Sequence, residues 1–283
     1  MSTRVGVIGL GLMGSGIAEV CARAGHDVRV VETDGAALAA GLDRVRASLD
    51  RGVDRGKLTA EDAAAALARI SGDLELQHLG DRELVIEAAV EDEALKLDLF
   101  RRLDAVVGDP GAILASNTSA IPISKLAAAT ANPGRVIGLH FFNPAPVMPL
   151  VEIIRAIRTS DETAARSAAF VEGLGKTGVA AADRAGFIVN ALLVPYLLAG
   201  IRMLESAYAS AHDIDAAMRL GCAHPMGPLE LADLAGLDTV VGAARSLHRE
   251  FGEPLYAPPP LLLRMVEAGL LGRKTGKGFY EYE

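Results

Sequence analysis

The stretch VGVIGLGLMG, residues 5–14, decides the fold of the first half of the chain, because an apolar run leads directly into G-x-G-x-x-G. A helical stretch follows, and then a second apolar run that ends at Glu32. This order predicts a β-turn-α-β unit that binds a dinucleotide. Gly9 allows a tight turn, Gly11 lets the backbone approach a pyrophosphate, and Gly14 allows close helix packing. The predicted phosphate-binding loop, at the amino end of the helix, comprises Gly9, Leu10, Gly11, Leu12, Met13 and Gly14. A glycine-rich turn without a ligand is the alternative.

The acid at the end of the second apolar run selects the cofactor. A carboxylate at Glu32 can accept both ribose hydroxyls of NAD, whereas it would repel the 2′-phosphate of NADP. The alternative is a solvated acid at the end of a strand. The sequence therefore predicts NAD as the cofactor.

Composition narrows the class of protein. The chain has 283 residues, 51% of them hydrophobic, and a formal net charge of −8, which argues against nucleic acid as a partner. No apolar stretch reaches the roughly 20 residues that a membrane span needs, so we expect a cytoplasmic protein that does not bind membranes. Cys21 and Cys222 form neither a disulfide framework nor a metal-ligand pattern, and we expect both to be buried and no metal to be bound.

Strands and helices are expected to alternate up to about residue 184. The further strands are expected at 84–86, 113–115, 136–141, 150–155 and 177–181, and the helices between them at 34–50, 60–69, 93–107, 122–130 and 161–174. This alternation predicts an α/β fold of the Rossmann type, with a doubly wound, mostly parallel sheet, over residues 1–184. Residues 185–283 are expected to form an all-helical C-terminal domain. Its helices are expected at 187–204, 212–220, 228–250 and 259–269, with one strand at 278–280.

Ser119 and His140 fall where a doubly wound sheet binds ligands, beyond the carboxyl ends of strands. Glu152 lies twelve residues after His140, and Asn190 opens the long helix that follows. His140 can take a hydroxyl proton near neutral pH, and a carboxylate such as Glu152 would fix its tautomer and stabilise the imidazolium. Ser119 and Asn190 could bind oxygens of a substrate. The residues alone also allow a merely hydrogen-bonded histidine, a surface acid and two capping residues.

Five segments together carry a resemblance to a known family, and they occur in order along the chain. They are SNTS (116–119), GLHFFNPAPVMPLVE (138–152), GFIVN (186–190), HPMGPLEL (224–231) and GRKTGKGFY (272–280). These segments resemble those of the short-chain 3-hydroxyacyl-CoA dehydrogenases, most closely the bacterial 3-hydroxybutyryl-CoA dehydrogenases. The resemblance implies NAD-dependent, reversible oxidation of an (S)-3-hydroxyacyl-CoA thioester to the 3-ketoacyl-CoA.

The resemblance also implies a role for single residues. His140 would be the general acid/base with Glu152 as its partner, and Ser119 and Asn190 would contact substrate oxygens. Beyond the phosphate-binding loop and Glu32, the implied NAD contacts are Glu91, Lys96, Ser119, Asn143 and Lys274. For Lys96 and Lys274 the alternative is a solvated charge. The family also implies a homodimer formed through the C-terminal domains.

The implied contacts with CoA lie on the helical stretch after Glu32, at Ser48 and Arg55. Asp50 and Asp54 make this stretch less basic than in relatives, which leaves open an acyl carrier protein thioester or a free hydroxy acid as the substrate. Two further departures, at Pro149 and Ala191, replace basic residues of relatives, and we expect them to affect the pocket wall or the domain interface. A non-catalytic NAD-binding protein is the remaining alternative.

Overall fold

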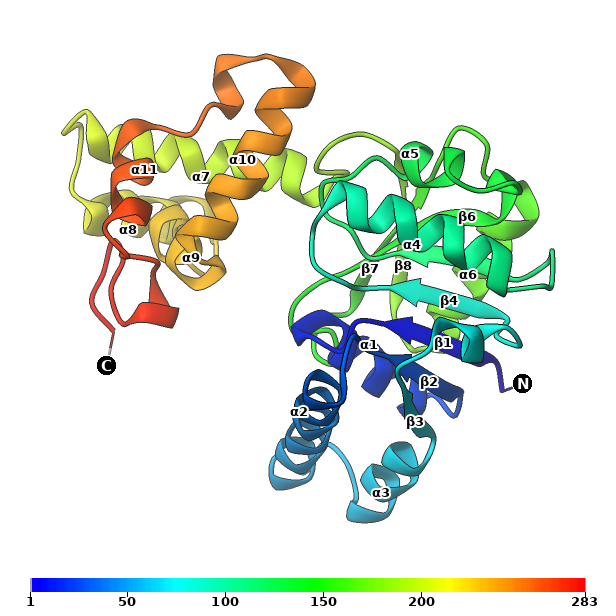
Figure 1. Ribbon diagram of the computed structural model, residues 1–283. Coiled ribbons are helices and arrows are strands. Elements are labelled where there is room, and N and C mark those ends of the chain that lie inside the picture. The colour runs from blue at the N-terminus through cyan, green and yellow to red at the C-terminus, as the bar shows by residue number, and fades with distance from the viewer. Residues whose placement is uncertain (1, 283) are drawn as a thin grey trace. The chain divides into compact units, whose positions relative to one another are not determined.

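The computed structural model describes residues 2–282, which divide into a first compact unit ending at Arg184 and a second beginning at Ala185 (Figure 1). The strands of the first unit are β1 (Arg4–Ile8), β2 (Asp27–Val31), β3 (Ile70–Asp73), β4 (Leu84–Glu87), β5 (Ile113–Ser116), β6 (Val136–Phe141), β7 (Leu150–Arg155) and β8 (Thr177–Ala182). They form one eight-stranded sheet in the order β3-β2-β1-β4-β5-β6-β7-β8. Neighbouring strands are parallel except β6 and β7, which are antiparallel. The predicted α/β fold with a doubly wound, mostly parallel sheet is confirmed.

The helices of the first unit differ at their starts, because the sequence supplies side-chain caps for four of them. These helices are α1 (Leu12–Arg23), α2 (Gly35–Asp54), α3 (Ala60–Ala68), α4 (Glu93–Val106), α5 (Ile123–Ala128) and α6 (Asp161–Gly173), with 3-10 turns at η1 (Leu76–Leu79) and η2 (Pro133–Arg135). The side chains of Asp34, Thr59, Asp92 and Ser160 accept N–H bonds at the starts of α2, α3, α4 and α6. Such caps satisfy N–H groups that the helix itself leaves unpaired.

The core of the first unit shows to which face of the sheet the residues of β1 and β6 point. Val5 and Val7 of β1 and Leu139 and Phe141 of β6 belong to one buried cluster, which also includes residues of α1, α2, α3 and α6. Alternate residues of a strand point to opposite faces of the sheet. His140, between Leu139 and Phe141, therefore points to the other face.

The strand β3 was not predicted, because its sequence Ile70-Ser71-Gly72-Asp73 has no apolar run. Its residues are half-buried or exposed, and it pairs with β2 at the edge of the sheet. An edge strand buries little side-chain area, so its sequence carries a weak hydrophobic pattern.

The second unit is helical, as predicted. It contains α7 (Val189–Glu205), α8 (Ala211–Cys222), α9 (Pro228–Ala235), α10 (Leu237–Phe251) and α11 (Pro260–Glu267), with 3-10 turns at η3 (Pro254–Tyr256) and η4 (Arg273–Thr275). The single helix predicted over 228–250 is wrong, because Gly236 has a φ of +93° and separates α9 from α10. This backbone conformation suits glycine and cannot continue a right-handed helix.

Two smaller predictions are also wrong. The stretch 278–280 forms no strand, because the N–H groups of Phe279 and Tyr280 donate to the carboxylate of Asp233 instead of to a neighbouring strand. Cys222, at the end of α8, is exposed. Cys21 is buried as predicted, and burial raises the pKa of its thiol to about 12. Within residues 2–282 no helix is long and apolar enough to cross a membrane.

Candidate active site

The central feature of the candidate site is a buried pair of side chains, His140 and Glu152. The antiparallel register of β6 and β7 places the two residues directly opposite each other. The Nδ1 atom of His140 lies 2.7 Å from Oε2 of Glu152, and the residues are only 6% and 1% exposed. The ring of Phe142 lies against the imidazole, with 4.6 Å between centroids. Burial rules out the alternative that Glu152 is a surface acid.

This geometry determines which imidazole nitrogen can exchange a proton with a substrate. A carboxylate can only accept a hydrogen bond, so the proton of a neutral His140 sits on Nδ1. The Nε2 atom is then the basic nitrogen. When Nε2 takes a proton, the carboxylate of Glu152 stabilises the positive ring. The pair is therefore suited to general acid/base chemistry.

Ser119 lies beyond the carboxyl end of β5, the strand next to β6, in a segment held by Glu91. The Oε1 atom of Glu91 accepts the hydroxyl of Thr118 and the N–H groups of Ser119 and Ala120, the last two at 3.2 Å. Asn117, at the start of the same segment, accepts the N–H of Phe141 at 2.8 Å. The structure thus brings Glu91 and Ser119 together, and Asn117 ties their segment to the strand of His140.

The phosphate-binding loop has the geometry that its glycines predicted. Gly9 has a φ of +83°, and a Cβ there would lie 2.8 Å from the carbonyl oxygen of Ala88. A Cβ at Gly14 would lie 1.8 Å from the carbonyl oxygen of Gly9, whereas Gly11 faces open space. No side chain caps the amino end of α1 and its first turn has no acid, so its N–H groups suit an anion. Leu12, in this turn, is 65% exposed, which suits a surface that a ligand covers.

Glu32 follows β2 directly and contacts the phosphate-binding loop. Its Oε1 accepts the N–H of Leu10, and its Oε2 accepts the N–H of Thr33 at 3.0 Å. Arg44 of α2 donates to the carbonyl oxygen of Leu10 at 2.8 Å, so a carboxylate and a guanidinium hold the same residue of the loop. These residues fit the pyrophosphate and ribose of a dinucleotide. Arg44 was not among the predicted site residues, since nothing in its sequence surroundings indicated this contact.

Lys96 is not a solvated charge, because it is 1% exposed and its ammonium lies 2.6 Å from Oε1 of Glu87 and 3.3 Å from Oε2 of Glu91. Glu87 ends β4 and is fully buried. Glu87 was not predicted as a site residue. The only signal in the sequence was an acid that closes the apolar run Leu84-Val85-Ile86.

Other predicted residues of the first unit lie outside this buried group. Asn143 is exposed on the segment between β6 and β7. Ser48 is half-buried on α2, and Arg55 is exposed at its carboxyl end. The structure thus places all three residues at exposed or half-buried positions of the first unit.

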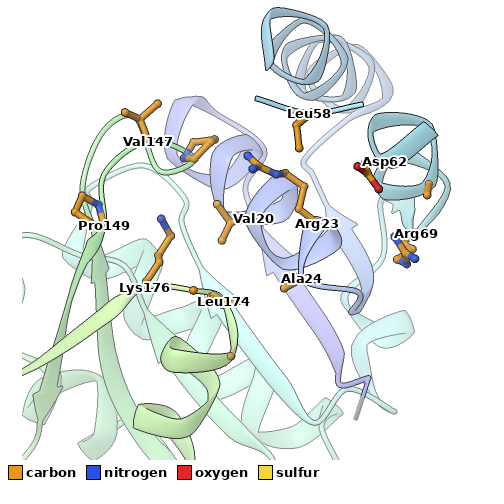
Figure 2. A pocket seen from close by; sticks show the side chains of 14 residues that line it. Val20, Arg23, Ala24, Leu58, Asp62, Arg69, Val147, Pro149, Leu174 and Lys176 are labelled. Atoms are coloured by element: carbon orange, nitrogen blue, oxygen red, sulfur yellow. The ribbon is translucent and has the colours of Figure 1, made fainter. Parts of the chain in front are cut away.

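A hollow of about 630 Å³ in the first unit lies apart from this group, and none of the predicted site residues lines it. It is formed by the second half of α1, by α3, and by the segments before β7 and β8 (Figure 2). Pro149 lines this hollow. Lys176 points toward the segment before β7 and donates to the carbonyl oxygens of Ala145 and Met148, each at 2.7 Å (Figure 2).

Two predicted residues belong to the second unit. Asn190 is the second residue of α7, whose N-cap is Ile188, so the alternative that Asn190 is the N-cap is wrong. Ala191 donates its N–H to the carbonyl oxygen of Gly186 at the turn into α7. Lys274, in η4, is 46% exposed at its side chain and donates to Asp238 at 2.6 Å.

Comparisons with known proteins identify the family. The family model described as "3-hydroxyacyl-CoA dehydrogenase, NAD binding domain" matches residues 4–184, and the model of the C-terminal domain of the same family matches residues 186–282. The chain belongs to the 3-hydroxyacyl-CoA dehydrogenase family. The predicted resemblance and the prediction of NAD as cofactor are both confirmed.

Members of this 3-hydroxyacyl-CoA dehydrogenase family match over almost the whole chain. A 3-hydroxybutyryl-CoA dehydrogenase of Mycobacterium tuberculosis is 57% identical over 280 residues, covering 99% of this chain and 98% of the relative. The crystal structure of FadB2 of M. tuberculosis has a TM-score of 0.98 at 56% identity, with both chains fully covered. That of (S)-3-hydroxybutyryl-CoA dehydrogenase from Ralstonia eutropha has a TM-score of 0.95 at 46% identity, again with full coverage.

Proposed function

We propose that this protein catalyses the reversible, NAD-dependent oxidation of a short-chain (S)-3-hydroxyacyl-CoA, such as 3-hydroxybutyryl-CoA, to the 3-ketoacyl-CoA. The observation that carries the proposal is the buried pair of His140 and Glu152, at the same edge of the sheet as the phosphate-binding loop. Ligands bind at this edge in doubly wound sheets. The names of the relatives supply the substrate class.

His140 performs the proton transfer in this proposal. Its Nε2 takes the proton from the 3-hydroxyl group of the substrate during oxidation and returns it to the ketone oxygen during reduction. Glu152 keeps Nδ1 protonated and stabilises the imidazolium. Acid/base assistance of this kind contributes about 10²- to 10⁴-fold in rate. Bound NAD supplies the acceptor for the hydride.

The other site residues bind and orient. We assign the substrate oxygens to Ser119 and Asn190. The phosphate-binding loop, with the uncapped start of α1, holds the pyrophosphate, and Glu32 holds the adenosine ribose. The remaining cofactor contacts are assigned to Glu91, Lys96, Ser119, Asn143 and Lys274.

The charges of α2 favour CoA as the thioester carrier. Arg44, Ser48, Arg51 and Arg55 recur at intervals of four, three and four residues, which is the spacing of one helical face. Asp43, Asp50 and Asp54, at intervals of seven and four, follow a different face. Within residues 2–282 no carboxylate lies at ion-pair distance from the three arginines of the first face, here called the basic stripe. Asp50 and Asp54, which made the sequence look less basic, therefore form no ion pair with the basic stripe. The basic stripe suits the phosphates of CoA, with Ser48 and Arg55 as direct contacts.

We further propose that the protein is a cytoplasmic homodimer that pairs through its second unit. Leu192, Tyr208 and Leu220 of this unit are 71%, 79% and 87% exposed, and burial of such side chains favours association. Light scattering during size-exclusion chromatography tests this: a particle near 59 kDa, twice the chain mass of 29.5 kDa, is expected. A monomer at micromolar concentration would contradict it.

The function is tested by following NADH absorbance with acetoacetyl-CoA, an acetoacetyl thioester of acyl carrier protein, and free acetoacetate. Rapid oxidation of NADH is expected with acetoacetyl-CoA. Turnover with only the carrier-protein thioester or only the free acid would overturn the assignment of CoA. A His140→Ala variant should lose at least a hundredfold in kcat. NADH binding without turnover of any substrate would point to a non-catalytic protein.

A further inference from the structure

The buried carboxylate of Glu87 has contacts that a core residue of a parallel sheet does not need. Its Oε1 accepts the ammonium of Lys96 at 2.6 Å and the N–H of Ala89 at 2.7 Å. Its Oε2 accepts the hydroxyl of Ser116, at the end of the neighbouring strand β5, at 2.6 Å. Glu87 thus joins the carboxyl ends of β4 and β5 through side chains.

These contacts extend into the segment that carries Ser119. The Oγ atom of Ser116 accepts the N–H of Thr118 at 3.2 Å. Lys96, held by Glu87, lies 3.3 Å from Glu91, and Glu91 accepts the N–H of Ser119. Ser119 is therefore linked to Glu87 by two routes, through Ser116 and through the pair of Lys96 and Glu91.

The carboxylate of Glu87 also holds the backbone segment against which the phosphate-binding loop packs, because it accepts the N–H of Ala89. Gly9 lies so close to the next residues of the chain after Glu87 that an added Cβ would be 2.8 Å from the oxygen of Ala88 and 2.9 Å from Cα of Ala89. Ala88 donates its N–H to Ile8 at 2.8 Å, and Lys96 donates to the carbonyl oxygen of Ala89 at 3.3 Å. A shift of Glu87 would therefore move Ala88 and Ala89, the residues against which Gly9 packs.

We infer that Glu87 is a positioning residue that fixes the Ser119 segment relative to the phosphate-binding loop. This inference rests on the proposed function, in which Ser119 contacts the substrate and the loop contacts NAD. Glu87 touches neither ligand in this role. It acts because a buried ion pair with full hydrogen bonding has one low-energy arrangement, and a displacement of about 1 Å at reacting groups lowers rates strongly.

The test is Glu87→Gln, which keeps the size of the side chain and removes the charge. We expect kcat with acetoacetyl-CoA and NADH to fall about 10- to 100-fold. We also expect weaker NADH binding in a fluorescence titration of the free enzyme. The matched control is Glu19→Gln: Glu19 is equally buried and pairs with Arg23 at 3.2 Å, but it lies in the second half of α1. Both variants should have a lower melting temperature than the wild-type protein, but only Glu87→Gln should change kcat and NADH affinity.

A milder variant keeps the inference testable if Glu87→Gln does not fold. Ser116→Ala removes one link to the Ser119 segment and leaves the ion pair of Glu87 and Lys96 in place. It should lower kcat several-fold and leave the NADH titration unchanged. Wild-type kcat in Ser116→Ala, or equal kinetic effects of Glu87→Gln and Glu19→Gln, would overturn the inference. If the wild-type protein turns over no thioester, the proposed function fails instead, while the NADH titrations of the Glu87 and Glu19 variants still test the link to the loop.

Discussion

Replacing Glu152 by glutamine tests most directly the proton transfer proposed for His140 and Glu152. Glu152→Gln preserves the shape of a side chain that is 1% exposed, so the packing between β6 and β7 should persist. The amide has no negative charge to stabilise a protonated His140. It also offers an N–H group as well as an oxygen to Nδ1, so it no longer forces the proton onto that atom. The substitution should therefore destabilise the transition state for proton transfer more than the ground state.

The size of the effect follows from the 2.7 Å contact between Nδ1 and Oε2. A hydrogen bond to a charged group contributes about 1.5–3 kcal/mol. Since about 1.4 kcal/mol corresponds to a tenfold change in rate, the charge alone predicts a loss of about 10- to 150-fold in kcat. A change of tautomer would add to this loss. The KM for NADH should stay within about twofold, because Glu152 is not assigned to the cofactor.

The assay is steady-state oxidation of NADH with acetoacetyl-CoA, with thermal melting measured in parallel. The matched control is Asp104→Asn, which removes the carboxylate of a largely buried ion pair at the opposite end of β6: Asp104 contacts Arg135 at 2.9 Å. Asp104→Asn should lower the melting temperature and leave kcat near the wild-type value. A kcat for Glu152→Gln within twofold of wild type would refute the role of Glu152 as the partner of His140.

Three further predictions concern the loop, the basic stripe and stability. Gly14→Ala should lower the melting temperature of the free protein, because its Cβ would lie 1.8 Å from the carbonyl oxygen of Gly9. Gly11→Ala, at a position that faces open space, should leave the melting temperature unchanged and weaken NADH binding at least tenfold in a fluorescence titration. Arg51→Gln should raise the KM for acetoacetyl-CoA about two- to fivefold in low salt, and Arg46→Gln, which removes a cation paired with Asp43 on another face of α2, should not. Burial lowers the pKa of His26 below its ordinary value of 6.5, so the unfolded state binds the proton more readily. Stability should therefore fall as the pH drops below about 6.5, and urea titrations of His26→Gln should lack this fall.

Most of the fold follows from hydrophobic patterning, because the central strands are buried on both faces. All residues of β4, β5 and β6 are buried, and their sequences are short apolar runs. The errors occur where burial is absent or where one residue changes the backbone direction. β3 is a half-exposed edge strand, and Gly236 looks like any glycine in a helical pattern until its positive φ is known.

The candidate site could be predicted only at the level of single residues. The sequence indicated that Ser119 and His140 follow or end strands, but not that Lys96 would be buried or that Glu87 would hold it. From the sequence alone, Lys96 reads as a solvated charge, since lysines are rarely fully buried without a partner. The partner, Glu87, closes an apolar strand and has no helical or motif spacing to Lys96. Contacts between side chains of different elements depend on the tertiary packing, which residue spacing does not encode.

The pairing of His140 with Glu152 depends on the one antiparallel step in the sheet. A parallel connection after β6 would align the third residue of β7, Glu152, with the third residue of β6, Gly138, and would start β7 at the opposite edge. Because the chain instead turns back over residues 142–149, the first half of β7 lies beside the last half of β6, and Glu152 faces His140. The carboxylate thereby reaches the edge of the sheet where the phosphate-binding loop lies. The reversal of one strand thus supplies His140, the proposed general base, with its partner and leaves the parallel strands β1, β4 and β5 to hold the phosphate-binding loop and the Ser119 segment.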